Sequence, residues 1–244
     1  MKPFLLLGTR EHDEAATSEF EAVRSHAGLT PDELIHLRVE AEPVPPLDLA
    51  DFSGMILGGG SFNASDPVKD ALQRRVESDL ASLVNRAITE DFPFLGLCYG
   101  VGVVTSVLGG TVNRDYAETA GPIEVKLTEE GAHDPVCAGL APSFHAFVGH
   151  KEACSIPPRG AAVLALGEQC PVQMYRIGAH VYVTQFHPEL APEDFIARIS
   201  LYKNAGYFDP NEFDRLCAEA LTGPVNGRQH LVLTNFVQRY ATED

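Results

Sequence analysis

The sequence lacks the cysteine pattern of a metal site and the long apolar run of a membrane protein. Its five cysteines are odd in number and form no C-x-x-C pair; they occupy positions 98, 137, 154, 170 and 217. This spacing argues against a zinc site and against a disulfide framework. No apolar stretch approaches the roughly 20 residues that cross a bilayer, and the first apolar run meets Arg10 and Glu11 too soon to form a signal-peptide core. We therefore predict a cytoplasmic protein that binds no metal.

Basic side chains are also scarce. The chain has 18 Lys and Arg against 34 Asp and Glu, which gives a formal net charge of -16. Such a surface repels phosphate backbones and anionic membranes, so neither nucleic acid nor a membrane is an expected partner. The 244 residues, 45% of them hydrophobic, suffice for one large α/β domain with a buried core.

The first part of the chain alternates short apolar runs with amphipathic stretches. Apolar runs that end in turn residues predict strands, and they cover residues 4–7, 34–39, 54–57 and 92–97. Longer stretches with apolar residues at a helical period predict helices, and they cover residues 13–27, 68–88 and 100–108. The alternation predicts a doubly wound, mostly parallel sheet with flanking helices, in which ligands bind at the carboxyl ends of the strands.

The second part of the chain predicts further strands and then helices. Short strands of mixed or antiparallel pairing are expected at residues 122–127, 144–148, 161–166, 172–176 and 180–185. Helices return after Pro192, and two more are expected at residues 212–221 and 230–240. We expect a single domain over residues 1–244, with residues 191–244 as a helical extension packed on it.

Cys98 lies where a predicted strand meets a predicted helix. The segment F-L-G-L-C-Y-G places Gly96 two residues before it and Gly100 two residues after it. A sharp strand-to-helix turn strains the backbone of a nucleophile, and glycines at these positions remove side chains that would collide. The helix N-terminus favours the thiolate, and the amide of Tyr99 faces a developing oxyanion. We predict that Cys98 is a nucleophile and that the other four cysteines are buried structural residues.

Three glycines follow the strand predicted at residues 54–57. Gly58, Gly59 and Gly60 permit close approach of the backbone to a ligand. Their amides could complete an oxyanion hole together with Tyr99. A simple glycine-rich turn is the alternative.

The segment Q-F-H-P-E, residues 185–189, supplies a base for the thiol. In an extended chain residues i and i+2 point the same way, so His187 and Glu189 can lie side by side. The carboxylate can then orient the imidazole and stabilise its charged form, as the third member of a triad does. The other histidines lack such neighbours, and we interpret them as ordinary polar residues.

Together, G-L-C-Y-G, G-G-G and F-H-P-E resemble the motifs of class I (triad) glutamine amidotransferases, with the amidotransferase domain of GMP synthetase as the nearest comparison. The motif order matches over residues 50–190. The resemblance implies a flavodoxin-like core, L-glutamine as substrate, a γ-glutamyl thioester on Cys98 and no cofactor. It also implies that His187 is the general base and acid, that Glu189 supports it, and that Gly60 and Tyr99 are oxyanion donors.

Two positions depart from the family pattern. Residues 149–152 read G-H-K-E where the family has S-H-x-D, a segment that helps to hold the amino-acid end of glutamine. His150 matches the pattern, whereas Gly149 replaces the serine and Glu152 lengthens the acid. Family members commonly carry Gln four residues after the nucleophile, and Gly102 stands there instead. Two lost contacts, each worth about 0.5 to 1.5 kcal/mol, weaken glutamine binding unless Glu152 reaches into the space beside Gly102 and restores one.

Three functions follow from these residues. The leading hypothesis is release of ammonia from L-glutamine for a separate acceptor enzyme or synthetase subunit, since we recognise no synthetase domain in the sequence. A γ-glutamyl hydrolase or related amidase, acting on another γ-glutamyl compound, is the alternative that Gly102 and Gly149 suggest. A noncatalytic binding or regulatory subunit is a third, and the presence of Cys98, His187 and Glu189 argues against it.

Overall fold

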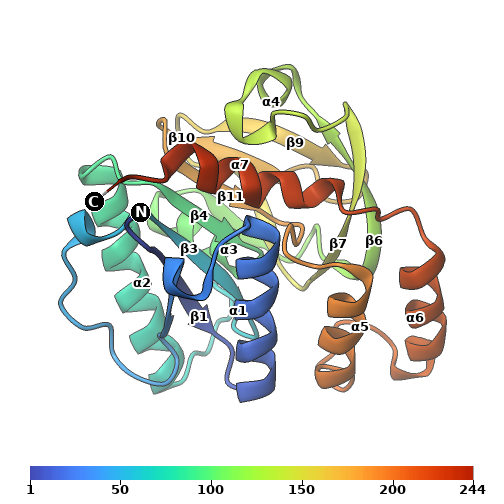
Figure 1. Cartoon of the computed structure of the whole chain (residues 1–244). Coiled ribbons are helices and arrows are strands. Elements are labelled where there is room, and N and C mark those ends of the chain that lie inside the picture. Colours follow the sequence, from blue (N-terminus) through green and yellow to red (C-terminus); the bar gives the residue numbers. More distant parts are fainter. Residues whose placement is uncertain (244) are drawn as a thin grey trace.

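The computed structural model describes residues 1–243 and is built around one large sheet (Figure 1). Within these residues the strand order is β2-β1-β3-β4-β11-β10-β9-β6-β7. The strands of this sheet are β1 Phe4–Thr9, β2 Leu34–Arg38, β3 Gly54–Gly60, β4 Phe94–Leu97, β6 Glu118–Leu127, β7 Ser143–His150, β9 Ala162–Gly167, β10 Met174–Ile177 and β11 Val181–Thr184. A small separate sheet pairs β5 Thr111–Asn113 with β8 Ala153–Ile156.

Strand direction changes in the middle of the large sheet. The strands from β2 to β11 pair in parallel, and those from β11 to β7 pair antiparallel. The doubly wound α/β sheet and the mixed pairing predicted for its second part are thus both present. Because β4 and β11 are parallel neighbours, the residues that follow them meet at one edge of the sheet. Cys98 follows β4, and the segment of His187 follows β11.

Helices cover both faces of the sheet (Figure 1). They are α1 Asp13–Ala27, α2 Ala71–Thr89, α3 Tyr99–Val107, α4 Glu129–His133, α5 Pro192–Leu201, α6 Phe213–Thr222 and α7 Leu231–Tyr240. Successive side chains of a strand point to opposite faces. Accordingly Phe4 and Leu6 belong to the core under α1 and α7, whereas Leu5 and Leu7 belong to the core under α2 and α3.

The helices after residue 191 divide into two groups. α7 returns to the sheet beside α1, and its apolar side chains join the core there. α5 and α6 pack on each other near β6 and form a third apolar cluster (Figure 1). In that cluster the ring of Phe195 stacks on Phe147 of β7, with centroids 4.3 Å apart. No helix within residues 1–243 has the length and apolarity needed to cross a membrane.

Element boundaries differ from the predicted ones at several places. β3 continues through Gly60, so the three glycines form the end of a strand and not a loop after it. α2 begins at Ala71 because the side chain of Asp70 accepts a hydrogen bond from the amide of Gln73 (2.7 Å). The short elements α4, β5 and β8 were not predicted, because three to five residues carry too little periodicity.

Candidate active site

Cys98 occupies a strained turn between β4 and α3. Its φ of 49° and ψ of -91° lie outside the backbone conformations that residues with a side chain normally adopt. Its amide donates to the carbonyl of Thr184 in β11 (2.7 Å), which ties the turn to the neighbouring strand. A Cβ atom on Gly96 would lie 3.1 Å from the Cα of Gly100, so only glycine fits there without displacement. A Cβ atom on Gly100 would meet only ordinary contacts, the nearest at 3.5 Å; the predicted need for glycine therefore holds at Gly96 and not at Gly100.

His187 and Glu189 form a buried pair beside Cys98. The Nδ1 atom of His187 lies 2.7 Å from Oε1 of Glu189, and His187 lines the same cavity as Cys98. Burial lowers the pKa of the His187 imidazole, but the charges of Glu189 and Cys98 outweigh burial and raise that pKa to about 9. Burial raises the pKa of the Glu189 carboxyl, and His187 and Arg198 together outweigh it and lower that pKa to about 2. The pair therefore favours an imidazolium next to a carboxylate.

A charged cluster beneath the turn fixes the end of β3. Oε1 of Glu19 accepts hydrogen bonds from Nε of Arg10 (2.7 Å) and from the amide of Gly59 (3.0 Å). Nη1 of Arg198 lies 3.8 Å from Oε1 of Glu19 and 3.8 Å from Oε1 of Glu189. The Gly59 amide already donates to Glu19 and is therefore not free to bind an oxyanion. The predicted oxyanion donors that remain are the amides of Gly60 and Tyr99.

Glu152 fills the space beside Gly102. Its Oε1 and Oε2 atoms accept hydrogen bonds from the amides of Ala64 and Ser65, each at 2.7 Å. A Cβ atom on Gly102 would come within 2.6 Å of Oε1 of Glu152. The longer acid thus occupies the room that a larger residue at position 102 would take, and it anchors the loop after β3.

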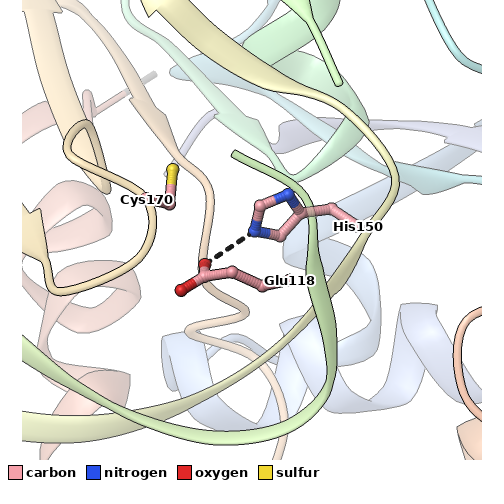
Figure 2. A group of neighbouring side chains, drawn as sticks. All are labelled: Glu118, His150 and Cys170. Carbon is pink, nitrogen blue, oxygen red and sulfur yellow. Dashed lines mark hydrogen bonds and ion pairs between the residues drawn. The ribbon is translucent and has the colours of Figure 1, made fainter. Parts of the chain in front are cut away.

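His150 is held from both sides in a buried network (Figure 2). Its Nδ1 lies 2.9 Å from the backbone oxygen of Glu152, which can only accept, so Nδ1 carries a proton. Its Nε2 lies 2.8 Å from Oε2 of Glu118, which also accepts from Gln173 (2.7 Å). A proton between Nε2 and the carboxyl satisfies both groups.

Glu118, His150 and Cys170 form the one group of three potential metal ligands found within residues 1–243, with their ligand atoms within 4.8 Å of one another. In Figure 2 the sulfur of Cys170 stands apart from the hydrogen-bonded pair. Burial also raises the pKa of the Cys170 thiol to about 12, which keeps it protonated. The nitrogen-to-oxygen contact of 2.8 Å matches a shared proton, since two ligands of one zinc ion at about 2.0 to 2.2 Å each stand farther apart in a tetrahedral site. The trio fits a hydrogen-bonded network better than a metal centre.

Two cavities meet at Cys98. The first, which we call the His187 cavity, measures about 490 Å³ with the solvent at its mouth included and is lined by His187, Arg10 and Arg198 beside apolar side chains. The second, which we call the Glu152 cavity, measures about 260 Å³ on the same basis. It is lined by residues that include Tyr99, Gly149, His150 and Glu152. Gly60, Cys98, Gly149 and Tyr207 border both, whereas Gly102 lies behind Glu152 and borders neither.

Comparison with known proteins identifies the family of this chain. The model of the class I glutamine amidotransferases matches residues 31–200. The chain belongs to that family. It is similar to one subunit of the glutamine-hydrolysing GMP synthase of Sulfurisphaera tokodaii, with 28% identity over 164 residues, 66% of this chain and 80% of that one. The subunit of the same name from Methanothermobacter thermautotrophicus is 31% identical over 165 residues, which are 64% of this chain and 79% of the relative.

The fold of this amidotransferase is also seen in solved structures. A glutamine amidotransferase from Thermotoga maritima superposes with a TM-score of 0.77 over 98% of both chains at 19% identity. That likeness confirms the flavodoxin-like α/β architecture. Family membership makes the chain a cysteine-dependent amidotransferase, whereas the roles of individual site residues stay predictions.

Several residues of the amidotransferase site were not predicted from its sequence. Glu19 interrupts the apolar face of α1, and Arg198 interrupts that of α5; a charge within an apolar stripe was the available signal. Arg10 follows the carboxyl end of β1, where ligands of such sheets bind. Among the other cysteines, Cys217 is only partly buried, so the expectation of a buried residue is wrong there. It lies near the surface because its helix, α6, is at the edge of the third apolar cluster.

Proposed function

We propose that the protein hydrolyses the side-chain amide of L-glutamine through Cys98, with a γ-glutamyl thioester as intermediate and ammonia as the released product. One observation carries the proposal: a cysteine in a strained turn lines the same cavity as His187, and Nδ1 of His187 contacts the carboxylate of Glu189. This arrangement supplies a nucleophile with a general base and acid beside it.

In this proposal each step of the reaction is assigned to a residue of the site. The Cys98 sulfur attacks the amide carbon, and the amides of Gly60 and Tyr99 stabilise the oxyanion. His187 passes its proton to the leaving nitrogen and then takes one from the water that opens the thioester. Glu189 keeps the imidazolium stable throughout, because their contact of 2.7 Å is buried from water.

The Glu152 cavity is the proposed site for the amino-acid end of glutamine. It borders Cys98 and contains Gly149, His150 and Glu152, the residues that correspond to the family's substrate-binding segment. Gly102 contributes by leaving room for Glu152. We assign the glutamine contacts to the backbone of residues 149–152, since both oxygens of Glu152 are already engaged by amides.

The ammonia acceptor is proposed from the relatives. The proteins from Sulfurisphaera tokodaii and Methanothermobacter thermautotrophicus are each named as one subunit of a GMP synthase, and we infer that a separate synthetase subunit receives the ammonia. We also propose that residues 1–244 form a single domain, which the return of α7 to the sheet supports. The cytoplasmic location stays a prediction from the sequence.

The test combines ammonia release with intact-mass measurement of the acyl-enzyme. L-glutamine should add a γ-glutamyl group to the wild-type protein and release ammonia, and Cys98→Ala should do neither. Cys217→Ala removes a partly buried thiol elsewhere and should behave as wild type. A γ-glutamyl adduct that persists in Cys98→Ala, or wild-type protein that stays unmodified and releases no ammonia, would sink the proposal.

A further inference from the structure

Two consecutive residues just before α7 bind the backbone on both sides of Glu189. Nδ1 of His230 lies 2.6 Å from the carbonyl oxygen of Pro188. Nε2 of Gln229 donates a hydrogen bond to the carbonyl oxygen of Leu190 (2.9 Å). Because a carbonyl oxygen can only accept, Nδ1 of His230 carries a proton. The residue before Glu189 and the residue after it are therefore both fastened to the start of α7.

The two side chains also determine each other's protonation. Nε2 of Gln229 lies 3.4 Å from Nε2 of His230. The amide nitrogen has two hydrogens, and one of them goes to Leu190. The second therefore needs an acceptor, which Nε2 of His230 supplies only when it carries no proton. Since Gln229 is fully buried, water does not take over this contact. The contacts select a neutral imidazole at position 230.

A second imidazole, that of His26 at the end of α1, stacks on the ring of His230. The ring centroids lie 3.6 Å apart and the planes are 1° from parallel. Oγ1 of Thr234 in α7 donates to the carbonyl of His26 (3.0 Å), which holds the two helices together at this point. Two imidazolium ions at this distance repel each other, so a positive charge on His26 opposes one on His230.

The surroundings of His230 agree with a neutral ring. Burial is the largest influence on the pKa of His230, and burial and the charge of His26 together lower that pKa. The hydrogen bond to Pro188 and the carboxylates of Glu189 and Asp194 act in the opposite direction and do not outweigh them. Protonation at low pH would remove the acceptor of the Gln229 amide. We therefore expect acid to weaken the attachment of the backbone around Glu189.

We propose that His230 and Gln229 are positioning residues, which keep the carboxylate of Glu189 against His187 while the ring of His230 is neutral. The inference rests on the proposed function of the triad. Neither residue lines the His187 cavity or the Glu152 cavity, so they act through the backbone of residues 188–190 and not on the substrate. The contact that they maintain is the one of 2.7 Å between Glu189 and Nδ1 of His187, and misplacement of a catalytic group by about 1 Å can lower a rate by about a hundredfold.

The experiment measures kcat and KM for ammonia release from L-glutamine in two variants of His230. Leucine has no donor, so His230→Leu should lower kcat by about tenfold and leave KM unchanged. Asparagine carries an amide nitrogen near the place of Nδ1 and does not titrate, so His230→Asn should keep kcat within about twofold of wild type. His133→Leu is the matched control. Nδ1 of His133 also contacts a carbonyl, that of Glu129 (2.8 Å), but at an exposed site in α4, and its loss should leave kcat and KM unchanged.

The pH dependence separates positioning from a merely structural role. The ratio of wild-type kcat to the kcat of His230→Asn isolates the titration of His230, because Cys98 and His187 are present in both proteins. This ratio should be constant above pH 6.5 and fall below it, since the pKa of His230 is lowered from 6.5. His26→Phe, made in both proteins, keeps a ring in the stack and removes its charge. The fall in the ratio should then begin at a higher pH.

The outcomes separate this inference from the proposed function. Equal kcat in wild type and His230→Leu, an equal loss of kcat in His230→Leu and His230→Asn, or a ratio that stays constant down to about pH 5 would each overturn the inference. Ammonia release by the wild-type protein would leave the Cys98 chemistry standing in all three cases. Wild-type protein that releases no ammonia and is not acylated at Cys98 would overturn the proposed function and this inference with it. The pH ratio does not use His230→Leu, so it decides the question even where that variant fails to fold.

Discussion

A methyl group at Gly96 should damage the active-site turn, and one at Gly100 should not. The added Cβ atom at Gly96 would lie 3.1 Å from the Cα of Gly100 and 3.2 Å from Cγ1 of Val183. Relief requires movement of the backbone that carries Cys98, and overpacking of this kind costs about 1 to 3 kcal/mol. The added Cβ atom at Gly100 would meet Leu57 at 3.5 Å, an ordinary contact, and Ala is favoured over Gly inside a helix by up to about 1 kcal/mol.

Thermal unfolding followed by far-UV circular dichroism measures both variants, because the chain has no tryptophan for fluorescence. A domain of this size loses about 2 to 4 °C of Tm for each kcal/mol. Gly96→Ala should therefore lower Tm by about 2 to 12 °C and slow acylation of Cys98, whereas Gly100→Ala should leave Tm unchanged or slightly higher. Equal losses of Tm in the two variants would refute the argument from contact distances.

Three further predictions concern the charged groups around the site. The stabilisation that His187 gains from Glu189 should be complete below pH 6.5 and lost as the pH rises through about 9, because the pKa of His187 is raised from 6.5 to about 9; Glu189→Gln should flatten this fall in unfolding free energy across a pH series. Glu152→Gln should lower the free energy of unfolding by about 1 to 3 kcal/mol and raise KM for glutamine more than it lowers kcat; steady-state kinetics showing a loss in kcat alone would contradict the proposed site. Glu19→Gln should lower kcat by about tenfold, the equivalent of one charge-assisted hydrogen bond, because the acceptor of the Gly59 amide and of Arg10 loses its negative charge. Glu21→Gln, a change at an exposed carboxylate on the same helix, should leave kcat unchanged.

Some parts of the molecule could be predicted from the local sequence pattern, because buried positions there recur with the period of a strand or a helix. The strand at residues 4–9 alternates between two cores, and its apolar run is visible without the structure. The turn at Cys98 and the pair of His187 and Glu189 depend on neighbours within five positions of one another, so their spacing alone predicts them. These are features whose causes lie inside one short segment.

Features that depend on distant parts of the chain could not be predicted in this way. The contacts of Glu19 with Arg10, with the Gly59 amide and with Arg198 join four segments, and no periodicity encodes such pairing. The walls of the His187 cavity come from β6, β7 and the segments around α5, and helix propensity does not determine how these elements pack. The position of Glu152 beside Gly102 was recognised as one of two alternatives, and only the three-dimensional structure places it.

The pairing of β4 with β11 also bears on the protein's synthesis. Gln185, which precedes His187, stands 87 residues after Cys98 and still reaches its sulfur (3.9 Å). At translation rates of about 5 to 20 residues per second, Gln185 is therefore made roughly 4 to 17 s after Cys98. During this interval the thiol lacks its proposed imidazole partner, and the Cys98 amide lacks its hydrogen bond to Thr184. The proposed reactivity of Cys98 therefore depends on a late strand, β11, that is inserted between β4 and β10 in the middle of the sheet.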